Sequence, residues 1–269
     1  MSRFIFIGAH PDDADIQFSA TALRLVRNGH KVKFVSVCNG DCGHQSMAPH
    51  ELAARRYLET QKAAGLIGIE EYEVLCHRDC EYEVTLQNRL EMIRIIRRFK
   101  PDVVVTHALN DYHVDHRNCG QVAQDAAYLL TVPHFCPDVE VPDRTPVFCT
   151  HFNRFNYPKP FRADAAVEFD SVFEEKLNIL ACHASQMFEW LPWDEGFKAE
   201  VERGLTEEEK RDSLLRRVMR FKNPGVLGRQ EALEYIYGAK AKDIVYAECF
   251  EQTEYGKVLP INEFRKLFV

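Results

Sequence analysis

RFIFIGA, residues 3–9, is the stretch that decides the fold. It is a compact apolar run that reaches Gly8, and a short run that ends at a turn residue is typical of a buried strand. After it, apolar residues recur at helical spacing from Ile16, which predicts a helix through about Asn28. The next run, KVKFVSVC at residues 31–38, alternates and is rich in β-branched side chains, so it predicts a second strand.

The same alternation of strand and helix continues to about residue 130. The expected strands are residues 73–76 and the DVVVT run 102–106, and the expected helices are residues 51–66, 86–99 and 116–130. Strands that alternate with helices predict an α/β fold: a Rossmann-like, mostly parallel sheet with helices on both faces and right-handed crossovers. Ligands of such sheets bind beyond the carboxyl ends of the strands.

The chain after about residue 132 has a looser pattern. Prolines between residues 133 and 160 indicate loops around short strands, residues 170–184 indicate a helix, and the charged, amphipathic stretch 197–222 predicts a surface helix. The apolar run 244–250 predicts a late strand. We therefore expect a single α/β domain over residues 1–269, with a less regular, mostly helical part from about residue 190.

The composition narrows the class of protein. The chain has 269 residues, of which 46% are hydrophobic, and this is enough for one sizeable core. The formal net charge of -7 disfavours a general nucleic-acid or anionic-membrane binder, because both are normally basic. No apolar stretch is long enough to span a bilayer. A signal peptide is not expected either, because Asp12 and Asp13 interrupt the early apolar run before a cleavage site could occur. The 9 cysteines, an odd number, are expected to be reduced thiols in a cytoplasmic protein.

Clusters of histidine and aspartate follow two of the predicted strands. Residues 8–13 read GAHPDD at the end of the first strand, and residues 111–116 read DYHVDH after the DVVVT strand. Two histidines with one carboxylate and an open position form a known catalytic zinc set. Zinc lowers the pKa of bound water, and a free carboxylate beside it can act as a general base. The adjacent Asp12 and Asp13 could divide these two tasks.

A simpler interpretation is that Asp13 and Asp115 cap the helices that follow them. It does not explain why two strand ends both carry histidine and aspartate, so the spacing favours metal binding.

Beyond this spacing, five segments resemble those of the PIG-L/LmbE-like deacetylase family. His10-Pro11-Asp12-Asp13 is similar to its AHPDD signature, and His113-Val114-Asp115-His116 is similar to its HPDH segment, with Val114 in place of proline. Three further segments occur in the family's order: Asn39-Gly40-Asp41, the R-x-x-E pattern from Arg56 to Glu59, and His183-Ala184-Ser185-Gln186. The resemblance covers roughly residues 3–190, with a weaker similarity at residues 247–250.

The resemblance implies a role for each matching residue. His10, Asp13 and His116 would be the ligands of one zinc ion per chain, and Asp12 would be the general base. His113 would stabilise the tetrahedral oxyanion, Arg56 and Asp41 would line the substrate pocket, and Asp115 would orient an imidazole from outside the ligand shell. The implied reaction is hydrolysis of the amide of a small N-acetylated sugar or its conjugate. Among the other histidines, His44 and His107 lie close enough in sequence to the site to be kept open.

Two other functions are compatible with these residues. Two histidines and a carboxylate also form the facial triad of non-haem Fe(II) oxygenases, although those sites usually lie on all-β scaffolds. A non-catalytic metal- or sugar-binding protein of the same fold is the other alternative, and Asp12 argues against it because a binding protein needs no base. The exact substrate, the metal used in the cell and whether the chain forms a homo-oligomer stay open.

Overall fold

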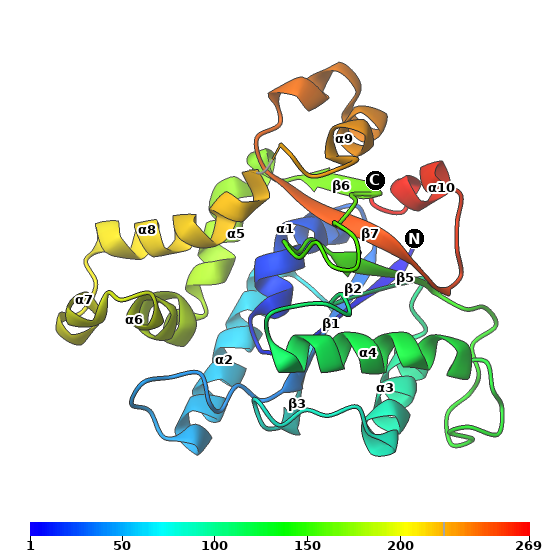
Figure 1. Cartoon of the computed structure of the whole chain (residues 1–269), viewed down its shortest axis with the longest axis horizontal. Helices are drawn as coiled ribbons and strands as arrows, with labels where there is room; N and C mark the ends of the chain where they lie inside the picture. Colours follow the sequence, from blue (N-terminus) through cyan, green and yellow to red (C-terminus); the bar gives the residue numbers. More distant parts are fainter. Residues whose placement is uncertain (223) are drawn as a thin grey trace.

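The computed structural model describes residues 1–222 and 224–269. Within them lies a sheet with the strand order β3-β2-β1-β4-β5-β7-β6 (Figure 1). The strands are β1 (Arg3–Gly8), β2 (Lys31–Cys38), β3 (Glu71–His77), β4 (Val103–Thr106), β5 (Val147–His151), β6 (Ala165–Glu168) and β7 (Ala247–Gly256). The strands β1 to β5 are parallel, whereas β7 is antiparallel to both β5 and β6. The predicted Rossmann-like α/β fold is confirmed.

The chain crosses from one half of the sheet to the other between β1 and β4. After β1 it winds outward through β2 and β3, and then it returns to place β4 on the other side of β1. A crevice forms at such a reversal of strand order, beyond the carboxyl ends of the two strands, and open α/β sheets bind ligands there.

Helices cover both faces of the sheet because side chains alternate along its strands. Phe4 and Phe6 pack into one buried cluster with α1 (Asp13–Arg27), α2 (Pro49–Ile67) and α5 (Phe173–Ala181). Ile5 and Ile7 point the other way, into a second cluster formed with α3 (Leu86–Phe99) and α4 (Val114–Leu129). Burial of a large apolar side chain contributes about 1.5–3 kcal/mol, so the two layers fix the ends of β1 and β4 in space.

The later helices are short and form a lobe beside α2 and α5, shown in yellow in Figure 1. This lobe contains the π-helical turn η2 (Ser185–Trp190), α6 (Leu191–Asp194), α7 (Lys198–Arg203), α8 (Glu207–Val218) and the 3-10 turn η3 (Met219–Lys222). Farther along are α9 (Arg229–Tyr237), the 3-10 turn η4 (Gly238–Asp243) and α10 (Ile261–Lys266), while a short 3-10 turn, η1 (Asp170–Val172), precedes α5. In the described residues no helix is both long and apolar enough to cross a membrane.

Two expectations about the later chain were wrong. Residues 197–222 are not one helix, because Gly204 has a φ of +84° that ends α7, and Thr206 then starts α8 with a reciprocal capping box to Glu209. The late strand begins at Ala247 rather than at residue 244. The carboxylate of Asp170 accepts the backbone N–H groups of residues 245 and 246, and so holds them outside the sheet.

Candidate metal centre

The site begins at the ends of β1 and β4, which lie side by side. Ile7 of β1 is paired with Thr106 of β4, and Thr106 Oγ1 donates a hydrogen bond to the Ile7 carbonyl at 3.0 Å. The chain after β1 turns tightly, because the His10 carbonyl accepts the backbone N–H of Asp12 at 2.8 Å. The loops after the two strands therefore meet at the same edge of the sheet, where the strand order reverses.

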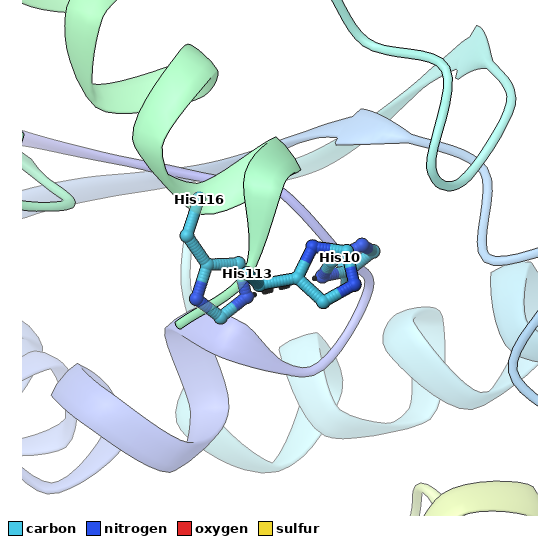
Figure 2. Close-up of side chains that lie close together, drawn as sticks. All are labelled: His10, His113 and His116. Carbon is cyan, nitrogen blue, oxygen red and sulfur yellow. Dashed lines mark hydrogen bonds between the residues drawn. The ribbon is translucent and has the colours of Figure 1, made fainter. Parts of the chain in front are cut away.

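Three side chains from these segments converge. His10 Nδ1 lies 3.2 Å from His116 Nε2 and 3.7 Å from Asp13 Oδ2, and His116 Nε2 lies 3.4 Å from Asp13 Oδ1. Figure 2 shows His10 and His116 close together, with the ring of His113 beside them. The rings of His10 and His113 meet edge to face, with centroids 4.6 Å apart.

The spacing and chemistry of His10, Asp13 and His116 fit a metal ion. A tetrahedral zinc site with bonds near 2.1 Å places its ligand atoms about 3.4 Å apart, which is the scale of the three separations. Among the groupings of nearby donor atoms in the described residues, two share His116: His10 with His113 and His116, and Asp13 with His107 and His116. Two imidazoles and one carboxylate could hold Zn²⁺ here and leave a position open toward the cavity.

Asp13 is held in place by the backbone. Its Oδ2 accepts the N–H groups of Ala9 at 2.9 Å and His10 at 2.8 Å. Burial alone would raise the pKa of Asp13, but its interactions with the adjacent His116 and His107 hold that pKa well below its ordinary value. The carboxylate is therefore ionised before any cation binds.

Each of the two converging imidazoles also has a carboxylate on its far nitrogen. His10 Nε2 lies 3.1 Å from Asp115 Oδ2, which in turn accepts the backbone N–H of Cys80 at 2.6 Å. His116 Nδ1 lies 2.9 Å from Asp111 Oδ1. Although burial opposes it, the hydrogen bond and charge of His116 lower the pKa of Asp111 to about 2. Outer carboxylates of this kind orient metal-ligating histidines. Asp115 was expected from the sequence, but Asp111 was not, although it stands in the same DYHVDH segment.

Neither aspartate proposed as a helix cap makes a cap hydrogen bond. The N-cap of α4 is His113, whose Nδ1 accepts the backbone N–H of Asp115 at 3.2 Å. The N-cap position of α1 is taken by Asp12, whose side chain makes no cap hydrogen bond, while Asp13 is the first residue of the helix. The capping interpretation is therefore wrong for both Asp13 and Asp115.

Asp12 is paired with Arg56 rather than with the helix. Arg56 is 2% exposed, and its Nη2 donates to Asp12 Oδ1 at 2.8 Å. Its Nη1 lies 3.7 Å from Asp79, a buried carboxylate that the sequence analysis missed. Gly40 has a φ of +81°, and a Cβ there would come within 2.6 Å of the Arg56 side chain, so the loop after β2 closes directly over the guanidinium. Asp12 and Arg56 both line the cavity.

Asp41 does not line the cavity, contrary to expectation. Its carboxylate accepts Arg78 Nε at 2.9 Å and the backbone N–H of Asp79 at 3.1 Å, so it braces the loop that carries Asp79. His44 is also absent from the lining, and its Nε2 lies 2.9 Å from Glu189 Oε2. Both side chains are turned toward neighbouring loops instead of the metal centre.

His107 belongs to a chain of neutral rings behind the site. His151 Nδ1 lies 3.1 Å from the Phe152 carbonyl, which can only accept, and His151 Nε2 lies 3.0 Å from His107 Nδ1. Each ring therefore carries its proton on Nδ1, and His107 Nε2 accepts the backbone N–H of Ala9 at 3.1 Å. Burial lowers the pKa of both rings, and that of His151 falls to about 3. His107 Nε2 also lies 3.2 Å from Asp13 Oδ2, so the ring contacts Asp13 from behind the site.

The remaining family-like segments contact one another around this centre. Glu59 of the R-x-x-E pattern accepts Ser185 Oγ at 2.6 Å and the Ser185 backbone N–H at 3.0 Å. Gln186 Nε2 donates to the Gly43 carbonyl at 2.9 Å. His183 Nε2 lies 2.9 Å from Asp15 of α1. These contacts join the segment 183–186 to α2, to the loop after β2 and to α1.

A cavity of about 660 Å³ opens in front of the converging side chains. One side carries His10, Asp12, Asp13, His113 and His116, together with Arg56, Asp79 and Tyr112. The other side comes from the loop after β5 and from the helical lobe, and includes Arg154, Trp190, Arg216, Arg217 and Arg220. A volume of this size suits a small molecule.

Comparisons with known proteins show relatives in sequence and in fold. Residues 5–127 match the family model described as PIG-L: GlcNAc-PI de-N-acetylase. The chain is 26% identical over 201 residues to the diacetylchitobiose deacetylase of Thermococcus kodakarensis, covering 72% of this chain and 74% of the relative. It is also 26% identical over 162 residues to the 1D-myo-inositol 2-acetamido-2-deoxy-alpha-D-glucopyranoside deacetylase of Thermobispora bispora, covering 49% of this chain and 54% of that one.

Solved structures share the fold over almost the whole chain. The N,N'-diacetylchitobiose deacetylase of Pyrococcus horikoshii superposes with a TM-score of 0.69 at 22% identity, covering 94% of this chain and 84% of the other. The 4-carboxy-2-hydroxymuconate hydratase of Pseudomonas putida gives 0.71 at 18% identity, covering 97% and 99%. The resemblance to the PIG-L (LmbE-like) family that the sequence motifs indicated is thus matched by the family model over residues 5–127.

Proposed function

We propose that this protein is a zinc-dependent N-deacetylase that hydrolyses the acetamide of a small N-acetylated sugar or sugar conjugate. The main support is the convergence of His10, Asp13 and His116 within 3.2 to 3.7 Å of one another, with Asp12 next to them on the cavity. The curated relatives named above are deacetylases of N-acetylated sugars, and this supports the same substrate class here.

A zinc ion held by His10, Asp13 and His116 would polarise the amide carbonyl and lower the pKa of the attacking water. Asp12 accepts the proton of that water. Arg56 holds Asp12 Oδ1, and no hydrogen bond to Asp12 Oδ2 is found within the described part of the chain, so Oδ2 is the atom that takes the proton. The same carboxyl group then delivers the proton to the leaving amine, as a general base that becomes a general acid.

His113 stabilises the oxyanion of the tetrahedral intermediate. Its Nδ1 is occupied as an acceptor for the backbone N–H of Asp115, so a neutral ring carries its proton on Nε2. Burial and the positive charges of His10 and His116 lower the pKa of His113, which favours this neutral form. Nε2–H can then donate to the oxyanion, and one preorganised donor of this kind contributes about 3–4 kcal/mol to the transition state.

Acetate release tests this function directly. The zinc-loaded protein is incubated with N-acetylglucosamine, N,N'-diacetylchitobiose and an N-acetylglucosaminyl inositol, with and without EDTA, and acetate is measured. We expect release that stops with EDTA and returns with added zinc. No acetate from any of these or related amides, at full zinc occupancy, would contradict the proposal.

The two alternatives give different results in the same assay. An Fe(II) oxygenase consumes dioxygen and is restored after chelation by Fe(II) rather than by zinc. A non-catalytic binding protein binds the sugars without releasing acetate. The deacetylase relatives do not favour either alternative.

A further inference from the structure

The side of the cavity formed by the loop after β5 and the helical lobe is rich in arginine. Arg216 and Arg217 both bind the carboxylate of Glu195, which partly neutralises them. Arg154 and Arg220 also line the cavity, and within the described residues neither has a carboxylate within the 4.0 Å of an ion pair. This side therefore presents two guanidinium groups without a counter-charge.

Arg220 lies over the ring of the adjacent Phe221 but has no acidic partner among the described residues. It is only partly exposed, and its Nε is buried and makes no hydrogen bond to the residues that the structure describes. Burial and the positive charge of Arg154 lower the pKa of Arg220 to about 10, while the negative charges of Asp13 and Asp111 act in the opposite direction. A buried donor without an acceptor is destabilising, and so is the proximity of two like charges.

The position of the two arginines favours a role in substrate binding over a role in stabilising the fold. They line the same cavity as the candidate metal ligands, and Arg220 is close enough to Asp13 for their charges to interact. They also lie outside residues 5–127, the part of the chain that matches the family model. The arginine side of the cavity is thus contributed by the part of the chain most free to set substrate choice.

We propose that Arg154 and Arg220 bind an anionic group, a carboxylate or a phosphate, on the N-acetylated substrate. Arginine suits this task because its planar fork of N–H donors matches both oxyanions. The substrate anion supplies the missing counter-charge and the missing acceptor at once. The cavity of about 660 Å³ and the net charge of -7 favour a small anionic molecule over a polyanion such as nucleic acid.

This inference rests on the proposed deacetylase function, and three substrates separate the two. Acetate release and calorimetric binding are measured with N-acetylglucosamine, N-acetylglucosamine 6-phosphate and N-acetylmuramic acid, which carries a carboxylate. The proteins are the wild type, Arg154→Gln, Arg220→Gln and the control Arg98→Gln. Arg98 is an exposed arginine of α3 that does not line the cavity, so its variant changes net charge equally.

We expect at least one of the two anionic substrates to have a kcat/KM about 10- to 100-fold above that of the neutral sugar, the scale of a charge-assisted contact. Arg154→Gln and Arg220→Gln should remove most of this preference, because they raise the KM of the anionic substrate more than that of the neutral sugar. Arg98→Gln should keep the preference. The preferred anion, phosphate or carboxylate, identifies the group.

The two proposals fail in different ways. Equal use of neutral and anionic substrates, or a preference that survives both arginine variants, overturns the anion site and leaves the deacetylase standing. Absence of acetate with binding of the anionic sugar that depends on Arg220 overturns the deacetylase and leaves the anion site standing. If a glutamine variant is poorly folded, Arg154→Lys and Arg220→Lys test the same preference with the charge kept, and we expect partial retention.

Discussion

Arg56 and Asp12 form a buried ion pair, with Nη2 2.8 Å from Oδ1, that connects helix α2 to the start of α1. The pair leaves Oδ2 of Asp12 free to accept a proton and fixes the position of that oxygen. It also gives Arg56 a more specific task than the substrate binding expected from the sequence, because the guanidinium positions the candidate base.

The Asp12→Asn variant separates proton transfer from metal binding. Asparagine keeps an oxygen for Arg56 to bind but cannot accept the proton of the attacking water. We expect zinc content close to wild type and a kcat lower by about 10²- to 10⁴-fold. Metal analysis and initial rates of acetate release measure the two effects. Asp143→Asn, an exposed substitution far from the cavity, is the control, and near wild-type turnover in Asp12→Asn would refute the base assignment.

Replacing Arg56 should lower the rate without removing the metal. Arg56→Lys keeps a positive charge but loses the fork that reaches both Asp12 and Gly40, so we expect kcat to fall by about 10-fold, on the scale of one lost charge-assisted contact, with zinc retained. Arg56→Ala leaves Asp12 buried without a partner and should destabilise the fold by about 3–5 kcal/mol. Thermal melts and kinetics are compared with Arg94→Lys, an exposed pair with Asp138. A change confined to KM would favour the original substrate-binding role.

Each of His10→Ala, Asp13→Ala and His116→Ala should lose zinc and activity together, since each removes one of three ligands. His134→Ala, an exposed histidine, should keep both. Zinc per chain after dialysis is the measurement, with circular dichroism to show that the variants are folded. Full zinc occupancy in any one ligand variant removes that residue from the set.

Loss of the outer carboxylates, Asp111 and Asp115, should weaken the affinity for zinc without abolishing it. Asp111→Asn and Asp115→Asn weaken the hold on His116 and His10, and substitutions of such partners typically cost about 10- to 100-fold in metal affinity. Competition with a zinc chelator gives the dissociation constants. If Asp111→Asn binds zinc as tightly as the wild type, the 2.9 Å contact has no part in orienting His116.

The sequence was sufficient for the first half of the fold and for the convergence of side chains at the candidate metal centre. Alternation of apolar strands and amphipathic helices predicted β1, β2 and β4, and the rule that parallel strands end at one edge predicted that His10 and His116 would meet. The α1 start was placed three residues late, because Asp13 is polar and the periodic pattern shows only from Ile16.

What escaped prediction depends on loop conformation. Asp79 reaches Arg56 only because Asp41 and Gly40 shape the two loops after β2 and β3, and no spacing in the sequence encodes that contact. Arg220 lies more than 100 residues beyond His116, on a 3-10 turn that the pattern read as the end of a longer helix. Hydrophobic periodicity predicts regular helices and strands, but it does not predict the conformation of such turns.

The antiparallel strand β7 has a consequence for how the molecule is made. Residues 247–256 are synthesised long after β1 to β5, yet they cover the outer edge of β5, the strand that ends at His151 beside the metal centre. During translation the backbone N–H and C=O groups at that edge stay unpaired until about 100 further residues have been synthesised. A nascent chain that stops before β7 already contains His10, Asp13 and His116 but leaves the edge of β5 exposed to other chains. Synthesis of the last strand therefore completes a sheet that began at the other end of the sequence.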